Sequence, residues 1–379
     1  MNQKKFQHPG YAPLPYRLVL LLLLILLQAC STTPDKQPTD SGMVFFPPLP
    51  NPPRIQYLTS FSSSIDINPP DTNFESYILG KDKYKNAIPI NKPYGVQMHK
   101  GKIYVVDIRG AGYDILDLEN NKFSVVQGAG GGSMPKPINI TIDENGYKYI
   151  TDTQRNQVLV FNQHEKFVQA FGVKGQFRPG DTAIVGDKLF IADLKDNEIE
   201  VLNKNTGVLQ YKIGRTGKKD GELFTPTNIK IGPDNHLYVS ETGNFRVQKF
   251  TLDGQHVRNY GGIGTSIGKF ARPKGIALDR DGRLLIVDSA YENVQIMDKD
   301  GKLLMFFGKP GNLPEHMNLP ADIDVTYEIQ YFQQYAHPDF KLEYIILLSN
   351  QFGSTKINAY GVGRMKDMDY VEETVNKGK

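Results

Sequence analysis

Oxygen-bearing side chains recur along this 379-residue chain, each two residues after a proline. After Pro93, Pro137, Pro179, Pro226, Pro273 and Pro320, the second residue is Gly95, Asn139, Asp181, Asn228, Gly275 and Asp322. The oxygen atoms of the two Asn and two Asp residues suit a hard cation such as Ca²⁺ or another divalent cation, provided that the fold brings them to one point. A zinc-thiolate cluster is excluded, because the chain has one cysteine.

That cysteine, Cys30, lies in a sequence typical of a lipidation site. It closely follows an apolar run, Leu18–Leu27, which is shorter than the about twenty residues that span a bilayer but fits the about 7–15 of an export signal. Leu27-Gln28-Ala29-Cys30 resembles a bacterial lipobox, in which the cysteine is lipidated and becomes the mature N-terminus. We predict a lipoprotein signal peptide over residues 1–29 and a lipid anchor on Cys30. Ser31 favours the outer membrane of a bacterial cell envelope, by the enterobacterial sorting pattern.

The segment after Cys30 is polar and then proline-rich, so residues 30–53 are predicted to be a lipidated tether without a packed core. Residues 1–29 hold three basic and no acidic residues, and the remaining chain therefore carries 41 of each. A neutral balance gives no electrostatic case for general nucleic-acid binding. We expect a membrane contact through the lipid and no nucleic-acid partner.

The recurring prolines define the elements that must position these residues. They are 42 to 47 residues apart, and each opens an alternating apolar segment that is followed by further short strands. Four strands per period of about 45 residues are typical of a propeller blade, and the two-residue alternation excludes a helical solenoid. The sequence therefore predicts an all-β fold, a six-bladed β-propeller over residues 54–365 with four antiparallel strands per blade. A charged surface tail is expected over residues 366–379.

Three stretches resemble the NHL repeat: Asp152–Val158, Glu241–Phe250 and Pro273–Asp279. The resemblance covers about residues 54–365 and implies a six-bladed β-propeller. Six-bladed relatives include a peptide-amidating lyase and gluconolactonase-like hydrolases, which need metal ligands at the mouth of the axial channel. The histidines and disulfides of the lyase are missing here, which weighs against that chemistry.

Closure of the ring is predicted to involve both ends of the propeller. The sixth repeat offers three strands, Asp322–Val325, Tyr344–Ser349 and Lys356–Tyr360, but no convincing fourth. Residues 54–61 read as a fourth strand that no blade precedes. We predict that they complete blade six, which removes two exposed sheet edges.

In a propeller, the connections into the first strands and the turns after the second strands share one face, here called the top. An acidic residue recurs there once in each of five blades, at Asp107, Asp152, Asp193, Glu241 and Asp288. Recurrence favours a structural role, in which each carboxylate accepts backbone N–H bonds in its own turn. The histidines show no ligand spacing.

The same geometry directs Asn139, Asp181, Asn228 and Asp322 toward the mouth of the axial channel. Two interpretations stay open for these four residues. The simpler one is a water-filled channel with small polar walls, and the other is a cation site.

Blade six contains an insertion of about fifteen residues between its first and second strands, on the bottom face. Tyr327–Phe340 is rich in aromatic residues, and alternation on both sides of Ala336–Asp339 predicts a projecting hairpin. Either its rings fold back over the bottom of the channel, or Tyr331, Phe332 and Tyr335 dock a partner.

These features favour recognition over catalysis. We expect a lipid-anchored envelope propeller that presents a rigid face to a protein, peptide or glycan partner, with no catalytic residues assigned. The alternatives are a metal-assisted lyase or lactonase at the axial mouth, and an assembly factor, the latter by analogy alone.

Overall fold

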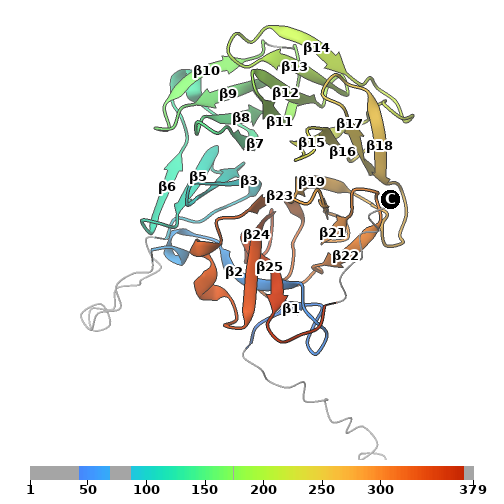
Figure 1. Cartoon of the computed structure of the whole chain (residues 1–379). Coiled ribbons are helices and arrows are strands. Elements are labelled where there is room, and N and C mark those ends of the chain that lie inside the picture. The colour runs from blue at the N-terminus through green and yellow to red at the C-terminus, as the bar shows by residue number, and fades with distance from the viewer. Residues whose placement is uncertain (1–41, 69–86, 174, 371–379) are drawn as a thin grey trace, which may run out of the picture. The chain divides into compact units, whose positions relative to one another are not determined.

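The computed structural model describes residues 42–68, 87–173 and 175–370. The described residues from Met43 onward form one compact unit. Its strands form six antiparallel sheets that surround a central axis (Figure 1). The all-β six-bladed propeller predicted from the repeats is therefore confirmed.

Blades one to five each contain four strands in chain order. Blade one consists of β3 (Pro93–His99), β4 (Lys102–Asp107), β5 (Gly112–Asp117) and β6 (Lys122–Val126). Blade two consists of β7 (Pro137–Ile142), β8 (Lys148–Asp152), β9 (Gln157–Phe161) and β10 (Phe167–Phe171). Blade three consists of β11 (Pro179–Val185), β12 (Lys188–Asp193), β13 (Glu198–Asn203) and β14 (Leu209–Ile213). Blade four consists of β15 (Pro226–Ile231), β16 (Leu237–Glu241), β17 (Arg246–Phe250) and β18 (His256–Gly261). Blade five consists of β19 (Pro273–Leu278), β20 (Leu284–Asp288), β21 (Asn293–Met297) and β22 (Leu303–Phe307).

Blade six joins the two ends of the propeller. Its strand order is β1-β2-β25-β24-β23. The bounds are β1 (Phe45–Phe46), β2 (Ile55–Phe61), β23 (Pro320–Thr326), β24 (Phe340–Asn350) and β25 (Ile357–Met365). Antiparallel pairing runs from Ile55 opposite Val362 to Phe61 opposite Ile357, which confirms closure by the N-terminal strand.

Strand β1 is an addition that the sequence did not predict. Phe45 is buried, and the ring of Phe46 lies 5.8 Å from that of Phe307 and 6.4 Å from that of Tyr360. The predicted tether boundary at Pro53 is therefore wrong. Part of the proline-rich stretch packs on blade six, because its two phenylalanines cover apolar rings there.

Each innermost strand begins at its repeat proline. A proline lacks the N–H that a central strand needs, but it is tolerated at the start of an edge strand that faces the axis. In every blade the pairing register shifts within three residues of this proline. Such a bulge re-aims the side chain that follows it, here at the position of the recurring Asn and Asp residues.

Apolar clusters fill the space between successive blades. One of them joins Tyr238 and Val247 of blade four to Ile276 and Ile286 of blade five. The closing cluster joins blade six to blade one, with Leu347 packed in the same group as Val96 and Val105. Because a four-stranded sheet cannot bury both faces alone, these clusters hold the ring together.

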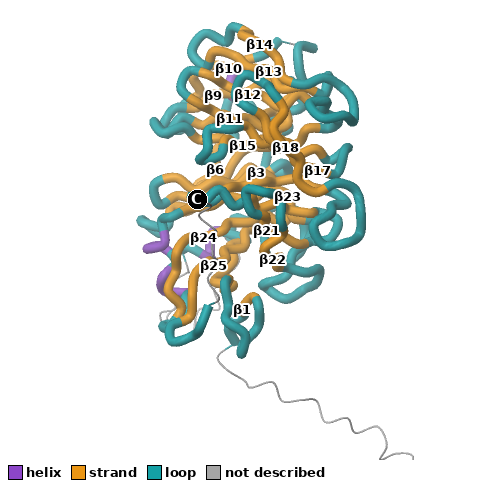
Figure 2. Tube along the Cα trace, turned by 45° about the vertical axis from the view of Figure 1, so that its right-hand side comes forward, coloured by secondary structure: helices purple, strands orange, loops and turns teal. Residues whose placement is uncertain are grey.

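The insertion in blade six differs from the prediction. Between β23 and β24 the chain forms two single-turn 3-10 helices, η3 (Ile329–Tyr331) and η4 (Gln333–Tyr335). Of these, η3 contacts β24 (Figure 2, helices in purple). The projecting hairpin is therefore wrong, because burial of Phe332 folds the segment back. Two other 3-10 turns are η1 (Ser64–Asp66) and η2 (Gly130–Gly132).

The described part of the tail from Lys366 is tied to the propeller at Tyr370. The Tyr370 hydroxyl donates to the Pro53 carbonyl at 2.8 Å, and the guanidinium of Arg54 lies 4.5 Å from the centre of its ring. Among residues 42–68, 87–173 and 175–370, no helix is long and apolar enough to cross a membrane. Cys30 lies outside these residues.

Candidate functional site

Two of the four predicted ligand residues are in direct contact near the propeller axis. Asn228 Nδ2 donates to Asp322 Oδ1 at 3.2 Å, although blade five separates their strands. The intervening position is Gly275, where an added Cβ would lie 2.5 Å from Cα of Asp322 and 2.8 Å from its Oδ1. The glycine therefore leaves the space in which these side chains meet.

Most oxygen atoms of this set already accept backbone N–H bonds. Asp322 Oδ2 accepts from the amide of Val96, and Asp181 Oδ2 accepts from the amide of Ile229. Asn139 Oδ1 accepts from Ile140, its own neighbour. The bonds from Val96 and Ile229 tie one innermost strand to another, which is a structural role, whereas the bond to Asn139 stays within β7. Asn228 Oδ1 is buried without a hydrogen-bond partner, and the cation site remains a prediction.

Sequence reasoning missed the charges deeper in the channel. Burial raises the pKa of Asp181, and the charge of Asp322 raises it further. Burial raises the pKa of Asp324 as well. Burial opposes protonation of Lys230, but these three carboxylates together raise its pKa. Lys230 thus supplies positive charge that a metal ion would otherwise bring. The signal was available, since Lys230 and Asp324 stand two residues after Asn228 and Asp322 on the same strands.

The two ends of the channel differ in character. At the top, Lys274 Nζ lies 4.7 Å from the centre of the Tyr94 ring. Burial, together with the charges of Arg272 and Lys92, lowers the pKa of Lys274 to about 8. At the other end, a pocket of about 370 Å³ has Gln97, Thr141, Thr182, Lys204 and Lys230 in its wall. The polar side chains of this pocket can therefore meet a polar ligand, whereas Lys274 and Tyr94 are buried.

Four of the five recurring acidic residues on the top face, all except Glu241, accept backbone N–H bonds in their own turn as predicted. Asp107 Oδ1 accepts from the amides of Arg109 and Gly110 in its own turn, and Asp152 and Asp288 accept in the same way. Each of the five carboxylates also accepts a hydrogen bond from a backbone N–H of the connection that enters its blade. They are buried, and they hold the top-face loops in fixed positions.

Exposed apolar side chains also occur in the loops of the top face. Six of them lie in the connections or turns of the top face: Val173, Phe224, Ile263, Ile267, Leu313 and Phe352. The most exposed are Ile263 at 74% and Val173 at 68%. A pocket of about 260 Å³ in blade five is lined by Ile267, Tyr291 and Phe306, among others. Sequence reasoning named the face but not these residues, because exposure depends on the packing of whole loops.

The three aromatic residues proposed to dock a partner have different environments. Phe332 is fully buried in the cluster that joins blades six and one, with Tyr331 and Tyr335 packed partly exposed against it. Phe332 therefore contributes to the core, as the first of the two interpretations expected. Partner binding by Tyr331 and Tyr335 remains a prediction.

Sequence similarity to known proteins covers only part of the chain. No family model matches the chain. It is 25% identical over 158 residues to "Protein brain tumor" of Drosophila melanogaster, covering 41% of this chain and 14% of that protein. It is 27% identical over 175 residues to human "NHL repeat-containing protein 3", covering 41% of this chain and 50% of that protein. The chain thus spans at most half the length of these relatives, and the similarity supports the NHL resemblance.

Solved structures share the fold at low sequence identity. A streptogramin B lyase matches with a TM-score of 0.51 at 18% identity, covering 73% of this chain and 84% of that one. A gluconolactonase from Xanthomonas campestris matches with a TM-score of 0.53 at 15% identity, covering 83% of this chain and 91% of that one. At these identities the likeness concerns the propeller fold alone.

Proposed function

We propose that this protein is a lipid-anchored recognition scaffold of a bacterial cell envelope, which binds a protein partner on the top face of its propeller. The observation that carries the proposal is the group of six exposed apolar side chains on that face. Sequence similarity to NHL-repeat proteins supports a binding role. Peptide and glycan partners are the other classes that such a face accommodates.

The rigidity of the top face favours binding. Buried carboxylates hold its loops through backbone bonds, as when Asp288 accepts from Ala271, Ala290 and Tyr291. A preorganised surface loses little conformational entropy on association. Apolar side chains carried by such a backbone gain free energy when a partner buries them, with little offset from ordering of the loop.

Replacing Ile263 and Ile267 with serine is expected to weaken partner binding at least about tenfold, because both side chains are mostly exposed in the free protein and would be buried in the complex. Stability should change by less than about 0.5 kcal/mol for each exposed residue. The measurement is capture of partners by the tagged full chain from envelope extracts, followed by mass spectrometry and by affinity measurement with the purified partner.

Val168→Ser with Val257→Ser is the matched control, because these side chains are 48% and 45% exposed on the outer strands β10 and β18. It should retain binding. Equal losses from both pairs would exclude the top face as the docking surface. Recovery of a peptide or a glycan instead of a protein would change the partner class.

The anchor has its own test. Cys30→Ser is expected to abolish fatty-acid labelling and to release the protein from the membrane fraction, because the lipid would be attached to this sulfur. Metabolic labelling with a fatty acid measures this directly. Labelling that persists unchanged would show that Cys30 is not lipidated, without bearing on the binding face.

The metal-assisted lyase or lactonase stays the alternative. The unpartnered Asn228 Oδ1 at the axis favours it, whereas Lys230 beside the axial carboxylates weighs against a metal there.

A further inference from the structure

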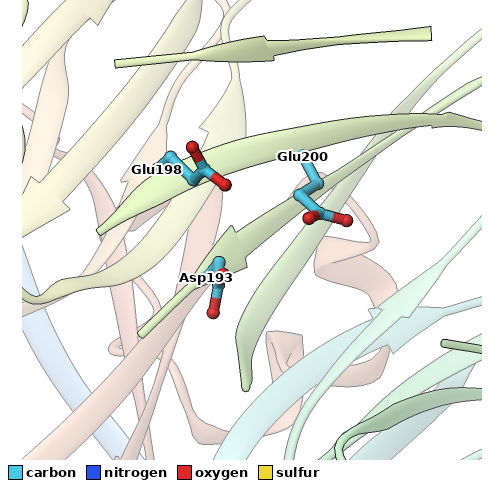
Figure 3. Close-up of side chains that lie close together, drawn as sticks. All are labelled: Asp193, Glu198 and Glu200. Atoms are coloured by element: carbon cyan, nitrogen blue, oxygen red, sulfur yellow. The ribbon is translucent and has the colours of Figure 1, made fainter. Parts of the chain in front are cut away.

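Blade three contains three carboxylates at positions where blades one, two, four and five have one or two and blade six has none. Asp193 ends β12 and pairs in register with Glu198 of β13, and Glu200 follows two residues later. One oxygen atom of each lies within 4.8 Å of the others, and the three side chains surround a small space (Figure 3). Asp193 and Glu200 are buried.

The equivalent positions of blade four show what such an acid requires. There Glu241 pairs in register with Arg246, and Gln248 follows two residues later. Arg246 Nε and Gln248 Nε2 both donate to Glu241 Oε1 at 2.7 Å. One positive charge and two donors therefore satisfy this buried carboxylate. In blade three both donors are replaced by glutamates, which only accept when ionised.

The consequence is visible at Asp193. Its Oδ1 accepts from the amides of Arg178 and Lys195, but its Oδ2 is buried without a hydrogen-bond partner. Burial raises the pKa of this carboxyl. A buried carboxylate oxygen without a donor is costly. Comparison with blade four therefore shows where the donors are missing, namely at Glu198 and Glu200.

Lys212 satisfies part of the cluster. Its ammonium pairs with Glu198 and, at 3.2 Å, with Glu200, and these are its ion pairs among the described residues. One ammonium offsets only part of the negative charge of three carboxylates, which favours a more highly charged cation in its place. The Lys212 side chain is 41% exposed, so it can turn into solvent when a cation enters.

We propose that Asp193, Glu198 and Glu200 form a binding site for a divalent cation, with Ca²⁺ as its ligand. A donor set of carboxylates alone suits a hard cation and lacks the nitrogen and sulfur atoms that favour zinc. Ca²⁺ accepts irregular oxygen ligands and takes its remaining ligands from water. The ion replaces the charge of the arginine in blade four. Through Glu200, which accepts from Gln176 Nε2 at 3.0 Å, it also braces the connection that enters blade three.

The test is titration of the EDTA-treated full chain with CaCl₂, followed by calorimetry and by thermal unfolding. Ca²⁺ should bind and raise the Tm by a few degrees, because it binds the folded state preferentially. Glu198→Arg with Glu200→Gln copies the pattern of blade four. This variant should lose Ca²⁺ binding yet melt in EDTA at or above the wild-type temperature, and that second readout separates loss of the site from misfolding.

Two further variants sharpen the result. Glu119→Gln with Glu144→Gln removes two exposed carboxylates elsewhere and should leave Ca²⁺ binding unchanged. Lys212→Met removes the competing ammonium and should tighten Ca²⁺ binding about tenfold, because a unit charge close to the ion is lost. A merely structural role for Lys212 would not produce this gain.

The proposal is overturned if wild type shows neither heat nor a Tm shift with CaCl₂ up to about 10 mM, above the range of weak extracellular calcium modules. It is also overturned if the variant with Glu198→Arg and Glu200→Gln still binds Ca²⁺. Loss of Ca²⁺ binding in Asp181→Asn, with binding retained in the double variant, would place the ion at the propeller axis instead. Weaker binding in Lys212→Met would contradict displacement of the lysine.

Discussion

Deletion of residues 54–61 is expected to destabilise the propeller by about 5 kcal/mol or more, enough to unfold it under mild conditions. The deletion removes β2, whose Ile55, Leu58 and Phe61 are buried in blade six. It also exposes the edge of β25, with which β2 pairs. Equilibrium unfolding of the full chain and the deletion variant in urea, followed by circular dichroism, measures the loss.

A control deletion and a point substitution test whether the loss of stability comes from opening the ring. Deletion of residues 31–38, within the predicted tether, should change the free energy of unfolding by less than about 0.5 kcal/mol. If the strand deletion cannot be produced, Phe61→Ala keeps the strand and should cost about 3–5 kcal/mol, because its ring is 2% exposed. Similar losses from both deletions would contradict a special role for the closing strand.

Arg246→Met is expected to cost about 3–5 kcal/mol, because it leaves the buried carboxylate of Glu241 without its charge partner. Glu241 is fully buried, and the Arg246 guanidinium also donates to the carbonyls of Lys219 and Glu222. The substitution therefore breaks an ion pair and releases the connection into blade four. Urea unfolding at neutral pH measures the change.

Arg215→Met is the matched control for this prediction. Arg215 pairs with Glu222 at 3.0 Å, but its side chain is 79% exposed, so its loss should cost less than about 1 kcal/mol. Adding Glu241→Gln to Arg246→Met should recover part of the stability, since the uncompensated charge is removed. Equal costs for the two arginine variants would show that burial of the Glu241 pair is energetically unimportant.

The repeating part of the fold was predictable from sequence because each blade reuses one local pattern. The innermost strands begin at the recurring prolines, and residues 54–61 close the ring at β2 as predicted. These features depend on alternation and on the need to pair sheet edges. They are encoded within short windows of the chain.

The insertion and β1 were not predictable, because both depend on distant contacts. Alternating aromatic and polar residues around Tyr331 fit a strand, but burial of Phe332 against the cluster that contains Leu342 and Met98 selects two 3-10 turns instead. Phe45 and Phe46 are too short a segment for any periodicity. Their position follows from apolar rings that belong to other strands.

The candidate sites divide in the same way. The positions of Asn139, Asp181, Asn228 and Asp322 on the innermost strands followed from the repeat, and all four side chains are buried. Their hydrogen-bond partners did not follow, because bonds such as that from Asn228 to Asp322 cross between blades. The carboxylates of blade three stand out only when the blades are compared position by position.

Ring closure by β2 also bears on how the chain reaches its native state. Ile55 pairs with Val362, so the first long strand has no partner until nearly the whole propeller has been synthesised. Contacts between residues so far apart in sequence slow folding, because the entropy of a large loop is lost before the contact forms. The same arrangement slows unfolding, since no blade at the junction can peel away until β2 detaches. The propeller is thus expected to resist degradation through a high barrier as much as through its equilibrium stability.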